Sequence, residues 1–250
     1  MRTNNYTLLF FLVIFFISGN FKLYMAEPLL PIEKRDKKKV FAHISSKLSE
    51  LVMSFSTYDK KKLRRILEEA AEKLNQRDFT RFIFLRDEMG WTILKQNVVE
   101  NNLDNVNLIF DIVEDKYNYN PYLIYNFVSA VDYQGQGALY VAVMRKNIDM
   151  VELLLRRAAE AFGHRKDLFY QFISQKEYIN GYTPLILATF NYDFETVELM
   201  VETIAKILGR NSSLFIEFLN EKSDSGYSAY FYAKPLGKKL LESFGATPMK

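Results

Sequence analysis

The chain has 250 residues, of which 49% are hydrophobic, with 10 glycines, 6 prolines and no cysteine. This composition excludes collagen-like, low-complexity and disulfide-stapled proteins, and it indicates an ordered chain with a buried core. The formal net charge is only +3, so no nucleic-acid partner is expected.

The first 26 residues have the layout of a signal peptide. Arg2 precedes a continuous apolar run at residues 8–17, and Ser-Gly-Asn follows that run. Ten apolar residues reach about halfway across a ~30 Å hydrocarbon core, so a membrane-spanning helix would have to continue through Lys22. We therefore expect residues 1–26 to direct export, leaving a secreted or periplasmic protein, with an uncleaved membrane anchor as the alternative.

Two further segments are expected before the central part of the chain. Residues 27–39 contain two prolines and the run KRDKKK, which is typical of a basic linker. Residues 40–89 are expected to form an N-terminal helical capping unit. Within it, residues 60–74 resemble residues 148–162, and both segments contain Ala-Ala-Glu.

Basic side chains are concentrated near the N-terminus. Residues 27–65 carry 11 basic and 5 acidic side chains, mainly in the runs at 34–39 and 60–65. One hypothesis is a weak electrostatic contact of this region with an anionic membrane surface. The simpler interpretation is that the runs are solvated helix ends, because no aromatic side chains alternate with the lysines.

A glycine-led segment recurs four times, at intervals of 45 or 46 residues. The glycine can adopt a positive φ, the Thr or Ser two residues later can cap a helix, and proline suits the first helical position. We expect repeats over residues 90–250 that start near these glycines. The four segments are Gly90-Trp91-Thr92-Ile93-Leu94, Gly135-Gln136-Gly137-Ala138-Leu139, Gly181-Tyr182-Thr183-Pro184-Leu185 and Gly226-Tyr227-Ser228-Ala229-Tyr230.

This pattern resembles the ankyrin repeat, in which a turn and the motif T-P-L-H-x-A lead into two antiparallel helices. Residues 181–188 (GYTPLILA) match it best, and the copy at Gly226 is degenerate, as a terminal cap is. The resemblance implies an all-α, ankyrin-like solenoid with helical caps. The period is longer than the ~33 residues of an ankyrin unit.

The extra residues in each unit also repeat. A motif with apolar residues at i, i+3 and i+4 precedes each glycine, beginning at Phe79, Ile124, Phe169 and Phe215. Its spacing predicts a third, short helix per unit. A three-helix unit of this length also fits HEAT or armadillo arrays, although the Gly-x-Thr-Pro-Leu turn favours the ankyrin repeat.

The resemblance implies protein binding through the turn tips and the exposed side of each first helix. Tyrosine and tryptophan commonly anchor such interfaces, although the same rings could simply pack on neighbouring turns. The candidate residues on the turns are Trp91, Gln136, Tyr182 and Tyr227, and those on the first helices are Met144, Arg145 and Phe190.

Catalysis is not expected. The chain has no cysteine, and its two histidines, His43 and His164, lie in unlike contexts far apart in sequence. No nucleophile elbow or phosphate-binding loop occurs. We therefore expect no metal, no cofactor and no small-molecule substrate, and we expect a binding protein for an unidentified protein partner. A hydrolase-type enzyme is the remote alternative.

The amino-acid usage adds one analogy. The chain is rich in Lys, Asn, Ile, Tyr and Phe, as proteins from AT-rich genomes are. In this respect it is similar to secreted bacterial ankyrin-repeat proteins, which implies a host-directed binder.

Export predicts a specific mature N-terminus. If residues 1–26 are a cleaved signal peptide, N-terminal sequencing of the exported protein should begin near Asn20 or Glu27. Recovery of intact Met1 on the exported protein would instead support the membrane anchor.

Overall fold

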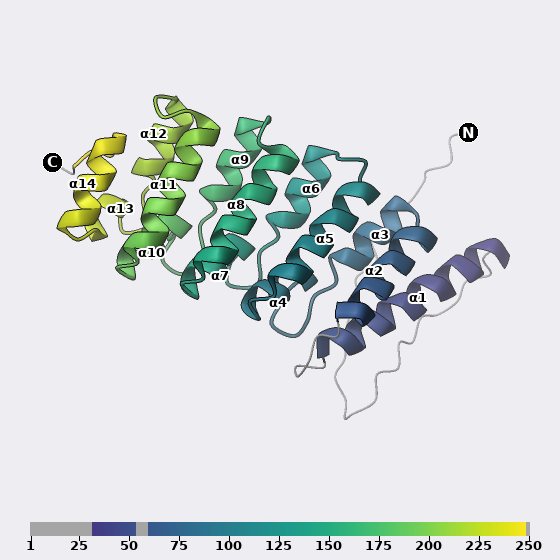
Figure 1. The fold of residues 1–250 in the computed structure, drawn as a ribbon. Coiled ribbons are helices and arrows are strands. Elements are labelled where there is room, and N and C mark those ends of the chain that lie inside the picture. The colour runs from purple at the N-terminus through teal and green to yellow at the C-terminus, as the bar shows by residue number, and fades with distance from the viewer. Residues whose placement is uncertain (1–31, 54–59, 249–250) are drawn as a thin grey trace, which may run out of the picture.

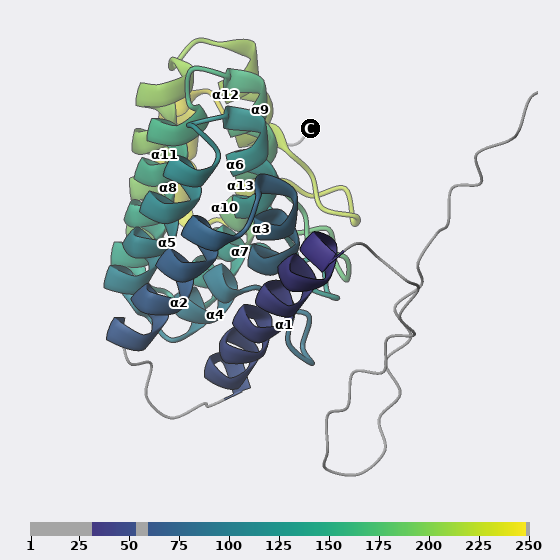
Figure 2. The same ribbon diagram turned by 90° about the vertical axis from the view of Figure 1, so that its right-hand side faces the viewer.

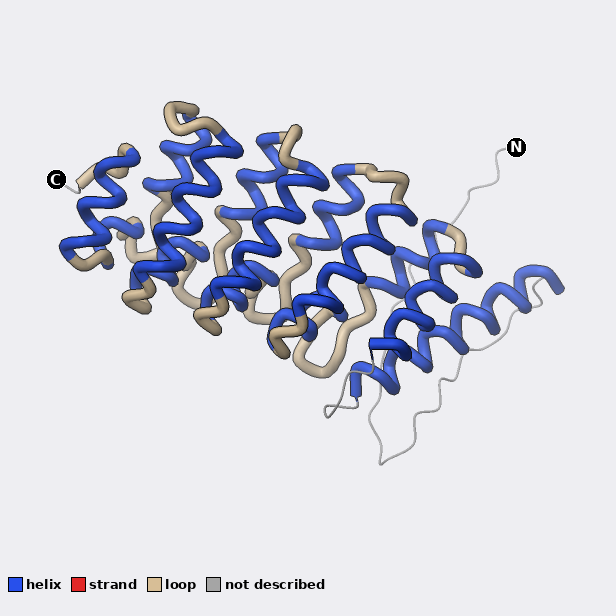
Figure 3. The backbone as a smooth tube through the Cα atoms, in the orientation of Figure 1, coloured by secondary structure: helices blue, strands red, loops and turns tan. Residues whose placement is uncertain are grey.

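The computed structural model describes residues 32–53 and 60–248. Over these residues the chain forms 14 helices and, apart from one isolated bridge, no β-structure. The helices stack side by side into an elongated array that runs from α1 to α14 (Figure 1). Figure 3 shows the same path with only helices and connecting loops in the described part. The all-α solenoid prediction is confirmed.

The helices fall into four groups. The N-terminal unit contains α1 (Ile32–Met53), α2 (Lys60–Lys73) and α3 (Gln76–Ile83). The inner helices, which follow the glycine turns, are α4 (Ile93–Val99), α7 (Ala138–Met144), α10 (Pro184–Phe190) and α13 (Ala229–Tyr232). The long helices are α5 (Leu103–Lys116), α8 (Ile148–Phe162), α11 (Phe194–Leu208) and α14 (Pro235–Phe244). The short helices that precede the turns are α6 (Pro121–Val128), α9 (Lys166–Ile173) and α12 (Ser213–Asn220).

The lengths of these helices explain the long repeat. An inner helix of 7 residues and a short helix of 8 residues together match the 15 residues, about 22 Å, of a long helix such as α8. Both α6 and α7 pack on α8. The long helices form one layer, and the short and inner helices form the other (Figure 2). The predicted third helix is therefore what covers the part of each long helix that the inner helix does not reach.

Two of the four inner helices begin with the predicted side-chain cap, whereas Ser228 at the start of α13 makes no such hydrogen bond. The hydroxyl of Thr183 accepts a hydrogen bond from the backbone N–H of Ile186 at 3.2 Å, and Pro184 occupies the first turn. Thr92 caps α4 in the same way, whereas Gly137 caps α7 without a side-chain bond.

The apolar motif of the short helices supplies much of the core. The apolar residues at positions i, i+3 and i+4 of this motif are buried in every copy. The ring of Phe162 on α8 makes edge contacts with Tyr125 at 5.8 Å and Phe172 at 5.9 Å, so one long helix joins the short helices on both sides of it. The buried motif residues are Phe79, Phe82, Ile83, Ile124, Phe127, Val128, Phe169, Phe172, Ile173, Phe215, Phe218 and Leu219.

The structure corrects the boundary of the basic linker. Helix α1 begins at Ile32, so the second half of the segment predicted as linker, residues 32–39, is helical. Consecutive basic residues are good helix formers, and α1 is anchored by packing further along its length. The export segment and residues 27–31 lie outside the described residues. Among the residues that the structure does describe, no helix is both long enough and apolar enough to cross a membrane.

The two basic runs do not form one surface. Helices α1 and α2 run in opposite directions (Figure 2). Lys47 of α1 pairs with Glu69 of α2 at 2.9 Å, and the guanidinium of Arg81 on α3 lies 5.0 Å from the ring centroid of Phe41 on α1. The starts of α1 and α2, where the runs lie, are therefore at opposite ends of the helix pair (Figure 2). A membrane contact that used both runs together has no support from this arrangement.

The turn glycines have the backbone conformation that the sequence predicts. Gly90, Gly135, Gly181 and Gly226 all have φ between +66° and +81°. A Cβ atom built at Gly135 would lie 2.5 Å from the ring of Tyr178, which belongs to the next turn, whereas one built at Gly226 meets nothing within 4 Å.

This difference makes a matched pair of alanine variants informative. Gly226→Ala should lower the free energy of unfolding by about 1–2 kcal/mol, the cost of positive φ in an alanine. Gly135→Ala should cost about 1–3 kcal/mol more, because the Tyr178 ring must also move. Urea unfolding followed by circular dichroism measures both. Equal losses would mean that the contact between turns contributes nothing to stability.

Candidate protein-binding surface

The inner face consists of the turn tips and the exposed side of the inner helices. The structure places every predicted binding residue on these elements, but it does not bring them all together. Tyr182, Tyr227 and Phe190 belong to one group of rings near α13. Trp91 and Gln136 lie near the other end around Lys95. Met144 and Arg145 are exposed at the end of α7, between the two.

Five rings form an aromatic cluster at the α10–α13 end of this face: Tyr182, Phe190, Tyr227, Phe231 and Tyr232. The rings of Tyr182, Phe190 and Tyr232 contact one another with centroids 5.5–5.6 Å apart. Tyr227 and Phe231 stack in parallel at 3.9 Å, and Phe231 meets Tyr232 edge-on at 5.2 Å. Offset and edge-to-face contacts of this kind hold the cluster in one arrangement before any partner arrives.

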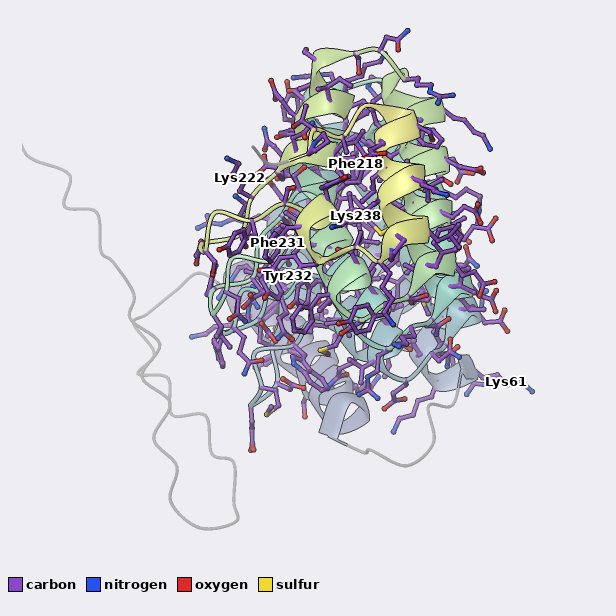
Figure 4. All side chains as sticks on the ribbon, turned by 90° about the vertical axis from the view of Figure 1, so that its left-hand side faces the viewer. Lys61, Phe218, Lys222, Phe231, Tyr232 and Lys238 are labelled. Atoms are coloured by element: carbon purple, nitrogen blue, oxygen red, sulfur yellow. The ribbon has the colours of Figure 1, made fainter. Side chains whose placement is uncertain are left out.

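The aromatic cluster is packed and exposed at the same time. Phe190 and Phe231 are each 47% exposed, and Tyr227 is 39% exposed. Phe231 and Tyr232 project from α13 at the C-terminal end of the array (Figure 4). Rigid, half-exposed rings are typical of interface anchors, because they bury much area with little loss of side-chain entropy.

Phe231 and Tyr232 were not among the binding residues predicted from the sequence. The signal was present in the run Ala-Tyr-Phe-Tyr after the fourth turn, at positions that are equivalent to Ile186 and Leu187 in the previous unit. The prediction of a degenerate terminal cap gives these rings no binding role.

Both basic and acidic side chains lie near the aromatic cluster, and the acidic ones include Glu177, whose charge acts on Tyr182, and Asp224, which lies against Gly181. The Lys234 ammonium lies 3.9 Å from the Tyr192 ring centroid, and Arg145 and Lys222 are exposed and form no ion pair with the described residues. The hydrogen bond with Tyr232, together with burial, raises the pKa of Tyr182 to about 12.

A buried ion pair supports the other end of the inner face. The Lys95 ammonium is 2% exposed, and it donates to a carboxylate oxygen of Asp132 and to the carbonyl of Gln136 in the next turn. It also lies 5.6 Å from the Trp91 ring centroid. Burial lowers the pKa of Lys95, and the hydrogen bond with Asp132 opposes that shift.

Burial opposes ionisation of Asp132, but hydrogen bonds from Lys95 and the amides of Gln136 and Gln134 outweigh it and lower the pKa of Asp132. Trp91 and Gln136 are therefore held by a structural link between two repeats.

An acidic side chain shapes each of the first three turns. One oxygen of Asp132 accepts the backbone N–H groups of Gln134 and Gln136, both at 2.9 Å. Asp87 and Glu177 do the same in their own turns. Ser223 occupies this position in the fourth turn, and its buried hydroxyl makes no such hydrogen bond. The sequence signal is an acidic residue three or four positions before each of the first three glycines, and it was not used in predicting the turns.

The turn tips carry exposed apolar residues that were also not predicted from the sequence. Their exposure ranges from 58% to 70%. They lie at nearly equal positions in successive turns, so they form a row along the edge of the inner face. These residues are Met89, Tyr133, Tyr178 and Ile179.

The described residues offer little for catalysis. No group of three or more His, Asp or Glu side chains among them is placed to hold a metal ion. His43 and His164 are both exposed and lie on different units. A shallow hollow of about 170 Å³ between α5 and α8 is smaller than the usual 300–1,000 Å³ of a ligand pocket.

Comparisons with known proteins agree with the turn and helix pattern. Residues 134–162, which contain the second turn, α7 and α8, match the family model of the ankyrin repeat. The same turn, inner helix and long helix recur in the neighbouring units. The family model thus identifies one ankyrin repeat in the chain, and the units that share its turn and helices recur every 45 or 46 residues. Ankyrin repeats are protein–protein interaction modules.

No curated protein matches the chain. Among solved structures, the ankyrin repeat domain of Bcl-3, described as a unique member of the IkappaB protein family, is similar at 20% sequence identity and a TM-score of 0.48. The similarity covers 86% of this chain and 83% of that one.

Removing one partner of the buried ion pair should be costly. Lys95→Met leaves Asp132 charged and buried, and we expect a loss of about 3 kcal/mol in the free energy of unfolding. Asp132→Asn added to Lys95→Met should recover about 1 kcal/mol, because the asparagine oxygen can still accept the turn amides without a buried charge. Urea unfolding of the three variants tests this, and a double variant no better than Lys95→Met would show that the charge is irrelevant.

Proposed function

We propose that this protein binds another protein through its inner face and that the aromatic cluster is the main anchor. The supporting observation is the set of five mutually packed rings, three of them more than one-third exposed, on the face that the turns and inner helices build. Mutual packing fixes the rings in advance, so little entropy is lost when a partner covers them. The role is non-catalytic.

We further propose that the protein acts outside the cytoplasm, as a secreted and host-directed binder. The signal-peptide layout of residues 1–26 and the composition of the chain support this. If the apolar segment stays in the membrane, the same inner face would belong to an anchored periplasmic scaffold.

Two single substitutions test the anchor. Phe190→Ser and Phe231→Ser should each weaken capture of a partner from host or bacterial lysate at least tenfold, the effect of a residue worth ~1.4 kcal/mol or more. Quantitative pull-down with the full chain measures capture, and thermal unfolding measures stability in parallel.

Tyr119→Ser is the matched control. This tyrosine is 67% exposed, but it lies in the turn between α5 and α6, away from the inner face. Capture should survive in this variant. Equal loss in all three variants, or a melting temperature that falls as far as capture does, would mean that the cluster is structural.

A further inference from the structure

Each of the first three turns along the inner face is covered by one residue of the next turn. The ring of Tyr133 lies against Gly90, the ring of Tyr178 against Gly135, and Asp224 against Gly181. In each case the covering residue directly follows the Asp, Glu or Ser that begins the next turn. A Cβ atom at Gly135 or Gly181 would collide with the covering residue, and one at Gly90 would be in tight contact with the Tyr133 ring, so glycine suits all three positions.

A backbone hydrogen bond accompanies this cover at two of the three junctions. The backbone N–H of Tyr178 donates to the carbonyl of Gln134 at 2.9 Å, and the N–H of Asp224 donates to the carbonyl of Asn180 at 3.0 Å. The accepting residue directly precedes the covered glycine in both turns.

A basic side chain that precedes the turn contacts the next unit at the first and third junctions, with a different partner in each. Arg86 donates to the carbonyl of Val131 in the next unit, and Lys176 pairs with Glu221 in the next unit at 3.0 Å. Glu221 lies three residues before Asp224, the residue that covers Gly181. Residues 221–224 therefore supply both the carboxylate that pairs with Lys176 and the residue that covers Gly181.

The fourth turn has the equivalents of these three groups, which are a glycine, the carbonyl before it and a basic side chain. None of the three makes the corresponding contact with a described residue. No described atom lies within 4 Å of a Cβ built at Gly226. The carbonyl of Ser225 accepts no hydrogen bond from a described residue, and Lys222, at the position of Lys176, is exposed without an ion pair there. Lys222, Phe231 and Tyr232 all lie at this end of the array (Figure 4).

We propose that this fourth turn docks an extended segment of a partner protein in which an acidic residue precedes a tyrosine by three positions. The tyrosine ring covers Gly226, its backbone N–H donates to the Ser225 carbonyl, and the acidic side chain pairs with Lys222. This inference rests on the proposed protein-binding function and assigns the partner's chemistry at one end of the inner face. The occupant continues the interface that the chain already forms between its own turns.

The choice of residues follows from the contacts inside the chain. Tyrosine is the cover at two of the three junctions. It would also extend the stack of Tyr227 and Phe231 beside it. The acidic residue is chosen because Lys222 is a solvated cation on an exposed turn, where a carboxylate improves both attraction and specificity.

The probe is a fluorescent peptide with the sequence of residues 175–181 and glutamate in the place of Gln175, EKEYING, added to the full chain. Fluorescence anisotropy should show binding with a Kd on the order of 1 mM, as expected for one ring, one hydrogen bond and one ion pair. Lys222→Glu should weaken it about fivefold, and a peptide with lysine in place of the first glutamate should restore it. Gly226→Asn should abolish binding, because asparagine tolerates the positive φ and occupies the space of the ring.

A control variant away from the inner face checks the specificity of this site. Lys206→Glu, on the long helix α11, should leave peptide binding unchanged. If Phe190→Ser weakens partner capture while no peptide binding is found up to 5 mM, on the order of the weakest affinity that these contacts supply, the proposed function stands and this site is wrong.

Other results would also overturn the site. Peptide binding that is indifferent to Lys222→Glu would do so. Sedimentation that shows a dimer of the full chain, lost in Gly226→Asn, would assign the fourth turn to a second copy instead.

Discussion

The packing of two short helices end to end along one long helix is the constraint on which the rest of the structure depends. Without cysteine or a described metal site, the array is held by apolar contacts, and an inner helix of 7 residues cannot cover a long helix of 15. The short helix fills the difference with the buried aromatic and aliphatic side chains of its motif. Because Phe162 contacts rings from the short helices on both sides, this packing also joins neighbouring units.

The turns are a second, more polar link between units, and they place the functional surface. A carboxylate that accepts several backbone N–H groups gives the first three turns the same shape, which is why side chains at equal positions fall into rows. Some of the side chains in these rows are packed, such as Lys95 beside Trp91, and others are exposed, such as Phe190. Catalytic residues need convergence in a cleft, whereas an open face with rows of side chains suits contact with another protein.

The C-terminal end of the inner face differs from the rest because α13 has only 4 residues and no further unit follows it in the described structure. Rings that would be covered inside the array remain exposed there. A terminal unit that served only as a cap would present a polar surface. The exposed stack of Tyr227 and Phe231 is therefore better explained by binding than by capping.

The sequence by itself determined the repeat, the positive-φ glycines, the helix starts at Thr92 and Thr183, and the third helix with its buried motif. Those features depend on local chemistry and on periodicity, which neighbouring residues encode. It also placed Tyr182, Tyr227 and Phe190 on one face. Only the tertiary structure decided that these three join Phe231 and Tyr232, that Trp91 lies over a buried lysine, and that residues 32–39 belong to a helix. Contacts between residues about 45 positions apart depend on how one unit is rotated against the next, and no short segment of the chain carries that information.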